Sequence, residues 1–150
     1  MRKIQYKFTN LKKAYQRLVE VANLYDGKNE IIRDSLIQRF EFTYELTHKT
    51  LQEFFKYSGI TMENSFPRMI YKKAYANHLI DNDKIWINLL EDRNATSHLY
   101  SEQIANEIAH RIVTDYVEVD SDLLQVRNQD GTSKDDDALG DFVLFTKGEN

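Results

Sequence analysis

The stretch 30–57 contains neither glycine nor proline, and its apolar side chains recur with the period of an α-helix. One broad face carries Ile32, Leu36, Phe40, Thr43, Leu46, Thr47, Leu51 and Phe54. Ser58 and Gly59 follow as a helix-end signal. Since an α-helix rises about 1.5 Å per residue, this segment spans about 42 Å, and we expect it to be the spine of a helical bundle.

Four further segments have helical periodicity, at about 7–25, 65–79, 83–92 and 101–116. Pro67 lies near the first turn of the third segment, where its missing N–H is tolerated, and Ser101 is suited to cap the fifth helix. The fifth helix groups Ile104, Ala105, Ile108, Ala109, Ile112 and Tyr116. With five glycines and one proline in 150 residues, few positions interrupt helices. We predict an all-α fold, an antiparallel up-and-down bundle of about five helices.

Acidic residues are concentrated at the C-terminal end. Residues 122–150 carry seven Asp or Glu and three Lys or Arg, whereas the preceding part of the chain is neutral. Helical periodicity also fades there, so we predict a bundle over 1–119 and a flexible or partner-docking acidic tail over 120–150. Residues 1–26 hold six Lys or Arg against two acids, which suits either a solvated helix face or local contact with a polyanion.

Cysteine is absent from the chain, which excludes disulfides and thiolate metal sites. All apolar runs are far shorter than the roughly 20 residues needed to cross a bilayer. The first residues run straight into an amphipathic pattern without the apolar centre of a signal peptide. These features lead us to expect a cytoplasmic protein without membrane contact.

Residues 92–100 read Asp-Arg-Asn-Ala-Thr-Ser-His-Leu-Tyr and lie at the junction of the last two predicted helices. Arg93 carries a planar fork of donors that can hold a phosphate, and His98 can move a proton near neutral pH. Tyr100 offers a stacking ring and a modifiable hydroxyl. This combination indicates work on a phosphodiester or a nucleotide.

Helical phasing places Arg93 in the middle of an apolar stripe formed by Ile85, Trp86, Leu89 and Leu90. A guanidinium that faces inward needs an anion, so either a phosphate or an acid of this chain is expected to meet it. In the purely structural alternative that acid is Asp92 or Glu102, and His98 is a satisfied loop histidine. If the fifth helix extends back to Thr96, His98 lies on its apolar side.

Two Glu-x-x-His units, Glu45 with His48 and Glu107 with His110, have the spacing of di-iron carboxylate bundles. Such a metal site needs its ligands inside the bundle. Phasing places the first pair on a polar face and His110 opposite the apolar stripe of its helix. We therefore expect no metal and no cofactor.

The run 86–100 resembles the signature of HEPN-domain proteins. It is most similar to the nucleotidyltransferase substrate-binding subunits that pair with small MNT-type nucleotidyltransferases in bacterial two-gene modules of the toxin–antitoxin kind. The resemblance covers about residues 5–119. Arg93 and His98 match the Arg-x4-6-His motif of that superfamily, and Asn94 matches the supporting polar residue after the arginine.

This resemblance implies a homodimer that binds a small nucleotidyltransferase encoded nearby, together with a nucleotide or the substrate of that enzyme. Related HEPN toxins are metal-independent ribonucleases, which the cognate nucleotidyltransferase neutralises and can adenylylate at the tyrosine matched by Tyr100. In that alternative Arg93 and His98 are catalytic. The RNA 2′-hydroxyl is the nucleophile, His98 is its base or acid, and Arg93 offsets the charge of the scissile phosphate. A dimer supplies the second histidine.

The chain is not expected to be the nucleotidyltransferase itself. Asp81 and Asp83 resemble the acid pair with which such enzymes bind metal, but no Gly-Ser precedes them at the required distance. The sequence therefore predicts the helical partner of a transferase, either as a binding module or as a ribonuclease.

Overall fold

A computed structural model describes residues 2–61, 64, 66–77, 80, 82–98 and 101–117. The described residues form no strand and fold into α1 (Arg2–Leu24), α2 (Glu30–Tyr57), α3 (Pro67–Ala76), α4 (Asp83–Ala95) and α5 (Glu102–Arg111). A 3-10 turn, η1 (Thr96–His98), follows α4, and a π-helical turn, η2 (Ile112–Tyr116), continues α5. The predicted all-α fold is confirmed. Tyr100 and the predicted tail over 120–150 lie outside the described residues.

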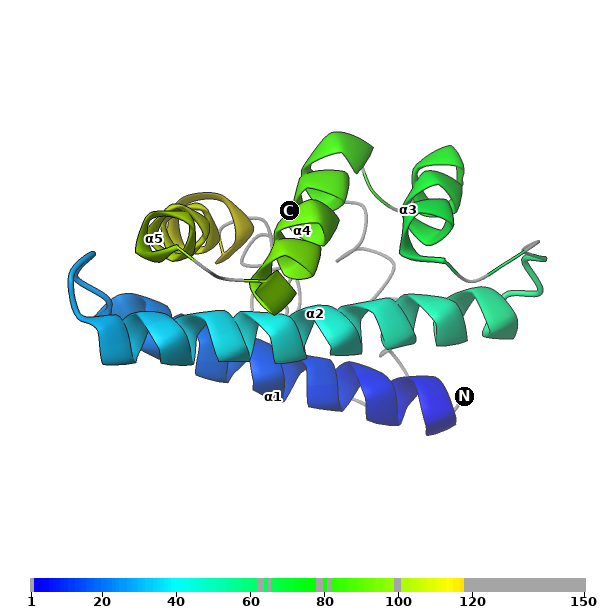
Figure 1. Cartoon of the computed structure of the whole chain (residues 1–150). Coiled ribbons are helices and arrows are strands. Elements are labelled where there is room, and N and C mark those ends of the chain that lie inside the picture. The colour runs from blue at the N-terminus through cyan, green and yellow to red at the C-terminus, as the bar shows by residue number, and fades with distance from the viewer. Residues whose placement is uncertain are drawn as a thin grey trace.

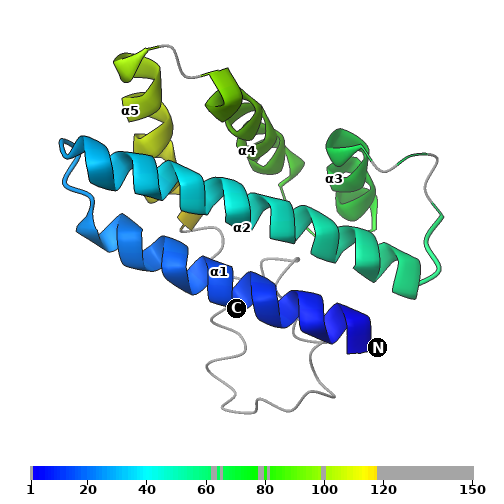
Figure 2. The ribbon, with the colours of Figure 1, turned by 60° about the horizontal axis from the view of Figure 1, so that its bottom comes forward.

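The two long helices α1 and α2 lie side by side and antiparallel, and the three shorter helices lie in a row along another side of α2 (Figures 1 and 2). Each short helix runs across α2 rather than along it. Helix α2 is therefore covered from two directions, and its buried residues include Thr43, Thr47 and Thr50 as well as apolar side chains. These hydroxyls donate to backbone carbonyls four residues earlier, at 2.6–2.9 Å, so their burial leaves no donor unpaired.

Helix α1 begins earlier than the predicted start at residue 7. Ile4 and Phe8 are both buried and extend the apolar stripe by another turn toward the N-terminus. At its other end the Asp26 carboxylate accepts the N–H groups of Lys28 and Asn29 at 2.8 and 2.9 Å, and these bonds lower the pKa of Asp26. Gly27 adopts a φ of 85°, so the turn needs a residue without a Cβ atom.

Helix α4 continues beyond its predicted end at residue 92. No glycine or proline interrupts the chain there, and the segment stays helical to Ala95 and then tightens into η1. Helix α5 begins only at Glu102, because the Ser101 hydroxyl accepts the N–H groups of the next turn at 3.2 and 3.4 Å. The predicted cap at Ser101 is confirmed, and the extension of this helix back to Thr96, which the sequence left open, does not occur.

Two further boundaries and one core residue differ from the prediction. Helix α3 is shorter than 65–79, with Pro67 as its first residue and Asn77 as its cap. Ile104 is 43% exposed, because α5 instead turns Ala105 and Ile108 toward the core.

In the described part of the chain, no helix combines the length and the apolar character needed to cross a membrane.

Candidate functional site

Arg93 lies in the last turn of α4 and extends toward α2, with 23% of its side chain exposed. Its terminal nitrogens lie 3.4 Å from the Glu41 carboxylate and 3.6 Å from that of Glu45. The Thr96 hydroxyl also donates to Glu41, at 3.0 Å. Two glutamates of α2 therefore hold the end of α4. The predicted inward direction of Arg93 is confirmed.

The acids expected to meet Arg93 are engaged elsewhere. Asp92 accepts two hydrogen bonds from Arg111, at 2.7 and 2.9 Å, and a third from the Tyr116 hydroxyl at 2.6 Å. Glu102 accepts a hydrogen bond from the buried Arg33. Consecutive residues of a helix point about 100° apart, so Asp92 faces α5 while Arg93 faces α2. Acids of this chain do meet Arg93, but they are Glu41 and Glu45, so the structural alternative is wrong in naming Asp92 or Glu102.

The environment of Asp92 also fixes the charge states around it. The hydrogen bond to the Asp92 carboxylate raises the pKa of Arg111, so this guanidinium remains charged. Burial first, and the hydrogen bond to Asp92 second, raise the pKa of Tyr116, which keeps its proton and its role as donor. The cluster is a closed set of matched donors and acceptors.

The hydrogen bonding of Arg93 is incomplete by comparison. Its Nε atom is buried and has no hydrogen-bond partner within the described residues. Its separations from Glu41 and Glu45 exceed the 2.7–2.9 Å of good charge-assisted hydrogen bonds. The buried Nε is out of reach of a ligand, but the loosely held terminal nitrogens of Arg93 retain donor capacity that an incoming anion can use.

Arg93 borders a pocket of about 650 Å³ between α1 and α2, which we call the arginine pocket. It is lined by Ala14, Arg17, Ser35, Gln38, Arg39, Glu41, Phe42, Glu45 and Arg93. Three arginines outnumber two glutamates, so the charge of the lining favours an anion. The Phe42 ring is 60% exposed and can stack on a base. The pocket thus offers donors for phosphate and an aromatic surface for a nucleobase.

The other motif residues lie on the segment that carries Arg93. His98 is exposed in η1, and Asn94 is exposed on α4. Arg93 Nη1 lies 3.5 Å from the Ser97 hydroxyl, directly before His98. His98 does not line the arginine pocket. The placement of His98 on the apolar side of a fifth helix depended on an extension of that helix to Thr96, and α5 begins only at Glu102.

Sequence reasoning missed the contributions of α1 and α2 to this site. Arg17, Arg39 and Phe42 carry no local motif, and only the helix pairing brings them beside Arg93. Glu45 and His48 are half-buried rather than on an open polar face, since the end of α4 covers Glu45. Burial lowers the pKa of His48, which favours its neutral form.

Among the described residues, no three His, Cys, Asp or Glu side chains come together in a way that could hold a metal ion. The two Glu-x-x-His units make other contacts. Glu45 faces Arg93, and Glu107 accepts a hydrogen bond from Gln103 at 3.2 Å.

Comparisons with known proteins agree with the predicted resemblance. The family model described as "Nucleotidyltransferase substrate binding protein like" matches residues 6–129. "Probable ribonuclease HepT" of Haemophilus influenzae is 27% identical over 119 residues, which cover 73% of this chain and 77% of the relative. A crystal structure of a Thermus thermophilus protein matches at 30% identity with a TM-score of 0.64, covering 72% of this chain and 90% of that one. The chain therefore belongs to the nucleotidyltransferase substrate-binding protein family.

Proposed function

We propose that this protein is the substrate-binding subunit of a two-protein nucleotidyltransferase. It binds a small nucleotidyltransferase encoded nearby and holds a nucleotide, or the substrate of that enzyme, in the arginine pocket. The observation that carries this proposal is the incompletely bonded Arg93 guanidinium at a pocket that also contains Arg17, Arg39 and the exposed ring of Phe42. Asn94 follows Arg93 and is exposed outside the lining of the pocket, so it can contact only a part of the ligand that extends beyond the pocket.

Phosphate is a better partner for Arg93 than the two glutamates are in their present positions. A guanidinium can bind phosphate oxygens with two parallel hydrogen bonds, and such bonds are short and strong. Glu41 and Glu45 instead hold Arg93 from 3.4 and 3.6 Å. They keep the side chain oriented toward the pocket without using all of its donors.

Exposed apolar side chains on and beside α3 support the binding of protein partners. Phe66, Met69 and Tyr75 are 68%, 38% and 49% exposed. Aromatic and methionine side chains of this kind are enriched in protein–protein interfaces, where burial stabilises them. A homodimer and a complex with the nucleotidyltransferase both need such surfaces.

Co-expression with the nucleotidyltransferase encoded nearby tests the proposal. We expect the two proteins to elute together in size-exclusion chromatography, with a mass by light scattering that corresponds to a dimer of this chain carrying the enzyme. We also expect ATP to bind the complex in calorimetry and to bind the Arg93→Ala complex at least tenfold more weakly. Separate elution, or equal ATP affinity of both complexes, contradicts the proposal.

A second candidate function is metal-independent ribonuclease activity, which the likeness to a relative named as a ribonuclease favours. His98, exposed and five residues after Arg93, would take the proton of an RNA 2′-hydroxyl as this oxygen attacks the adjacent phosphorus. Arg93 would offset the phosphate charge, and His98 of a second copy would protonate the departing 5′-oxygen. The cognate transferase would silence this activity, with Tyr100 as the residue that it adenylylates.

RNA cleavage by the purified chain in EDTA separates the two candidates. If the chain is a ribonuclease, we expect cleavage that His98→Ala abolishes. His110→Ala is the matched control, because His110 is an exposed histidine outside the motif. Intact RNA with the unaltered chain rejects the ribonuclease and leaves the binding subunit. A mass increase of one adenylyl group at Tyr100, with transferase and ATP, tests the modification.

A further inference from the structure

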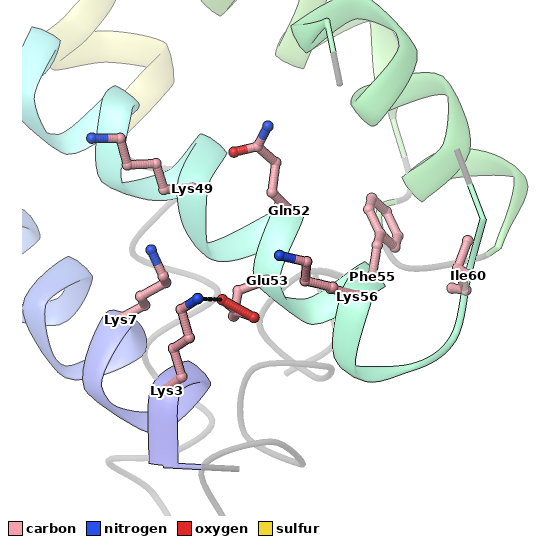
Figure 3. Close-up of a pocket in the computed structure, with 8 residues that line it drawn as sticks. All are labelled: Lys3, Lys7, Lys49, Gln52, Glu53, Phe55, Lys56 and Ile60. Carbon is pink, nitrogen blue, oxygen red and sulfur yellow. Dashed lines mark ion pairs between the residues drawn. The ribbon is translucent and has the colours of Figure 1, made fainter. Parts of the chain in front are cut away.

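A second pocket, of about 500 Å³, lies where the start of α1 faces the end of α2 (Figure 3). We call it the lysine pocket. Its lining consists of Lys3, Lys7, Lys49, Gln52, Glu53, Phe55, Lys56 and Ile60. Four lysines therefore face one acid. Because they come from both helices, this charge results from the pairing of α1 with α2 and is larger than either segment carries alone.

The one acid in the lysine pocket is already engaged. Glu53 is 12% exposed and lies 3.3 Å from the Lys3 ammonium. Lys7, Lys49 and Lys56 have no acidic partner within 4 Å in the described part of the chain. Lys7 is also half-buried, so its side chain is held against the protein surface. An anion bound among these three groups would relieve their mutual repulsion.

The stability of the isolated α1 helix does not account for Lys3. The first turn of α1 contains Lys3 and no acid, although the positive end of the helix dipole disfavours cations there. Lys56, in the last turn of α2, is favoured by the dipole. Lys3 therefore has a position that the isolated helix disfavours, whereas Lys7 lies in the second turn, where the dipole acts weakly.

The lysine pocket and the arginine pocket lie along the same face of α2. Lys56 follows Glu45 by eleven residues, which is three turns with only about 20° of rotation left over. Lys49 and Gln52 fall between them, within about 40° of the same direction. The rise from Glu45 to Lys56 is about 16 Å. A single mononucleotide seated at Arg93 is too short to fill both pockets, whereas a short polynucleotide strand can.

We propose that the lysine pocket binds backbone phosphates of a single-stranded RNA whose reacting end lies at Arg93. The proposal rests on the function proposed for the arginine pocket and extends it, because it assigns an oligonucleotide rather than a mononucleotide as the substrate class. Lys7, Lys49 and Lys56 bind the phosphates without reading the bases, since an ammonium group recognises charge. The strand then runs along α2 toward Phe42 and Arg93.

Fluorescence anisotropy with a labelled 12-nucleotide single-stranded RNA tests this assignment. All proteins carry His98→Ala, so that the RNA stays intact if the chain is a ribonuclease. We expect the triple variant Lys7→Gln, Lys49→Gln, Lys56→Gln to bind at least tenfold more weakly. The slope of log affinity against log salt should fall in magnitude by about 2, as loss of three phosphate contacts predicts. Circular dichroism checks that the variant folds.

The matched control is Lys28→Gln, Lys72→Gln, Lys84→Gln, which removes the same charge from exposed positions outside the lysine pocket. We expect it to weaken RNA binding less than threefold. Equal losses in the two triple variants overturn the proposal, because binding then follows net charge alone. A matching loss of ATP affinity in the pocket variant also overturns it, since the pocket then holds the phosphates of a mononucleotide.

Two further results separate this proposal from the function proposed for Arg93. In the first, Arg93→Ala leaves RNA binding unchanged while the triple lysine variant still weakens it. This result rejects the function proposed for the arginine pocket and supports RNA binding at the lysine pocket. If the pocket variant weakens only co-elution with the nucleotidyltransferase and not RNA binding, the lysine pocket is a protein contact and the proposal is overturned.

Discussion

Asp92 and Arg93 are neighbours in α4, yet their environments are opposite in kind. Asp92 is 9% exposed and accepts three hydrogen bonds of 2.6–2.9 Å from Arg111 and Tyr116. Arg93 has only longer contacts with two glutamates, a buried Nε without a partner in the described residues, and one side open to the arginine pocket. The charge of Asp92 is fully compensated within the fold, whereas Arg93 is held in place with some of its donors weakly bonded.

The comparison indicates that Asp92 stabilises the fold, whereas its neighbour Arg93 is available for binding. The cluster of Asp92, Arg111 and Tyr116 ties α4 to α5 and η2, and so fixes the rotation of α4 about its axis. That rotation directs the next residue, Arg93, toward α2 and its pocket. Four predictions test this contrast, in order of decreasing effect.

Asp92→Ala is expected to lower the free energy of unfolding by about 3 kcal/mol, because it leaves the Arg111 guanidinium and the buried Tyr116 hydroxyl without their acceptor. Urea denaturation followed by circular dichroism measures the loss. Asp34→Ala is the control, since Asp34 is an acid paired with arginine but 66% exposed, and it should lose less than about 1 kcal/mol. Equal losses of unfolding free energy in the two variants would contradict the structural role of Asp92.

Arg93→Ala is expected to change the free energy of unfolding by less than about 1 kcal/mol, because its pairs with Glu41 and Glu45 are long and partly exposed. Its affinity for nucleotide or RNA should fall about tenfold, which corresponds to about 1.4 kcal/mol. Arg93→Lys should recover only part of the affinity, since an ammonium group lacks the planar fork. A large loss of stability with unchanged affinity would place Arg93 with Asp92 as a structural residue.

Replacing both Glu41 and Glu45 by Gln should strengthen ligand binding about two- to fivefold. The substitution removes the carboxylates that compete for Arg93, and exposed ion pairs of this type contribute about 0.2–1 kcal/mol. The measurement is the same titration, at fixed salt. Weaker binding in this variant would show that the glutamates orient Arg93 more than they compete with the ligand.

The smallest effect concerns His48, which lies on the same face of α2 as Glu45. Burial lowers its pKa below the ordinary value of 6.5, and its Nδ1 atom is buried without a hydrogen-bond partner in the described part of the chain. The unfolded chain therefore takes up a proton at higher pH than the folded one does. Stability associated with neutral His48 is fully present above about pH 6.5 and is lost as the pH falls toward the lowered pKa.

His48→Gln should make the free energy of unfolding less dependent on pH in that range. Urea denaturation at a series of pH values from about 7.5 downward measures the slope. His110→Gln, at an exposed position, should leave the slope unchanged. A slope that persists in His48→Gln assigns the pH dependence to other groups.

The sequence predicted the number of helices, the bounds of α2 and the placement of Pro67 and Ser101, because these depend on local periodicity and on end signals within one turn. It also predicted that Arg93 faces inward. It missed the extension of α4 to Ala95 with the 3-10 turn η1 after it, and the start of α1 before residue 7. Both errors occurred where burial against another helix, rather than a local signal, decides whether the helix continues.

Local periodicity and motif spacing thus determined the helical class of this protein and the segment that carries Arg93 and His98. Only the tertiary structure decided which acids meet Arg93, since partners distant in sequence are set by how α4 crosses α2. The same holds for the two pockets. Lys7 of α1 joins Lys56 because α1 and α2 pair antiparallel, and Arg17 of α1 joins Arg93 because α4 also crosses α2. Packing of long helices places charges together that no stretch of the chain holds side by side.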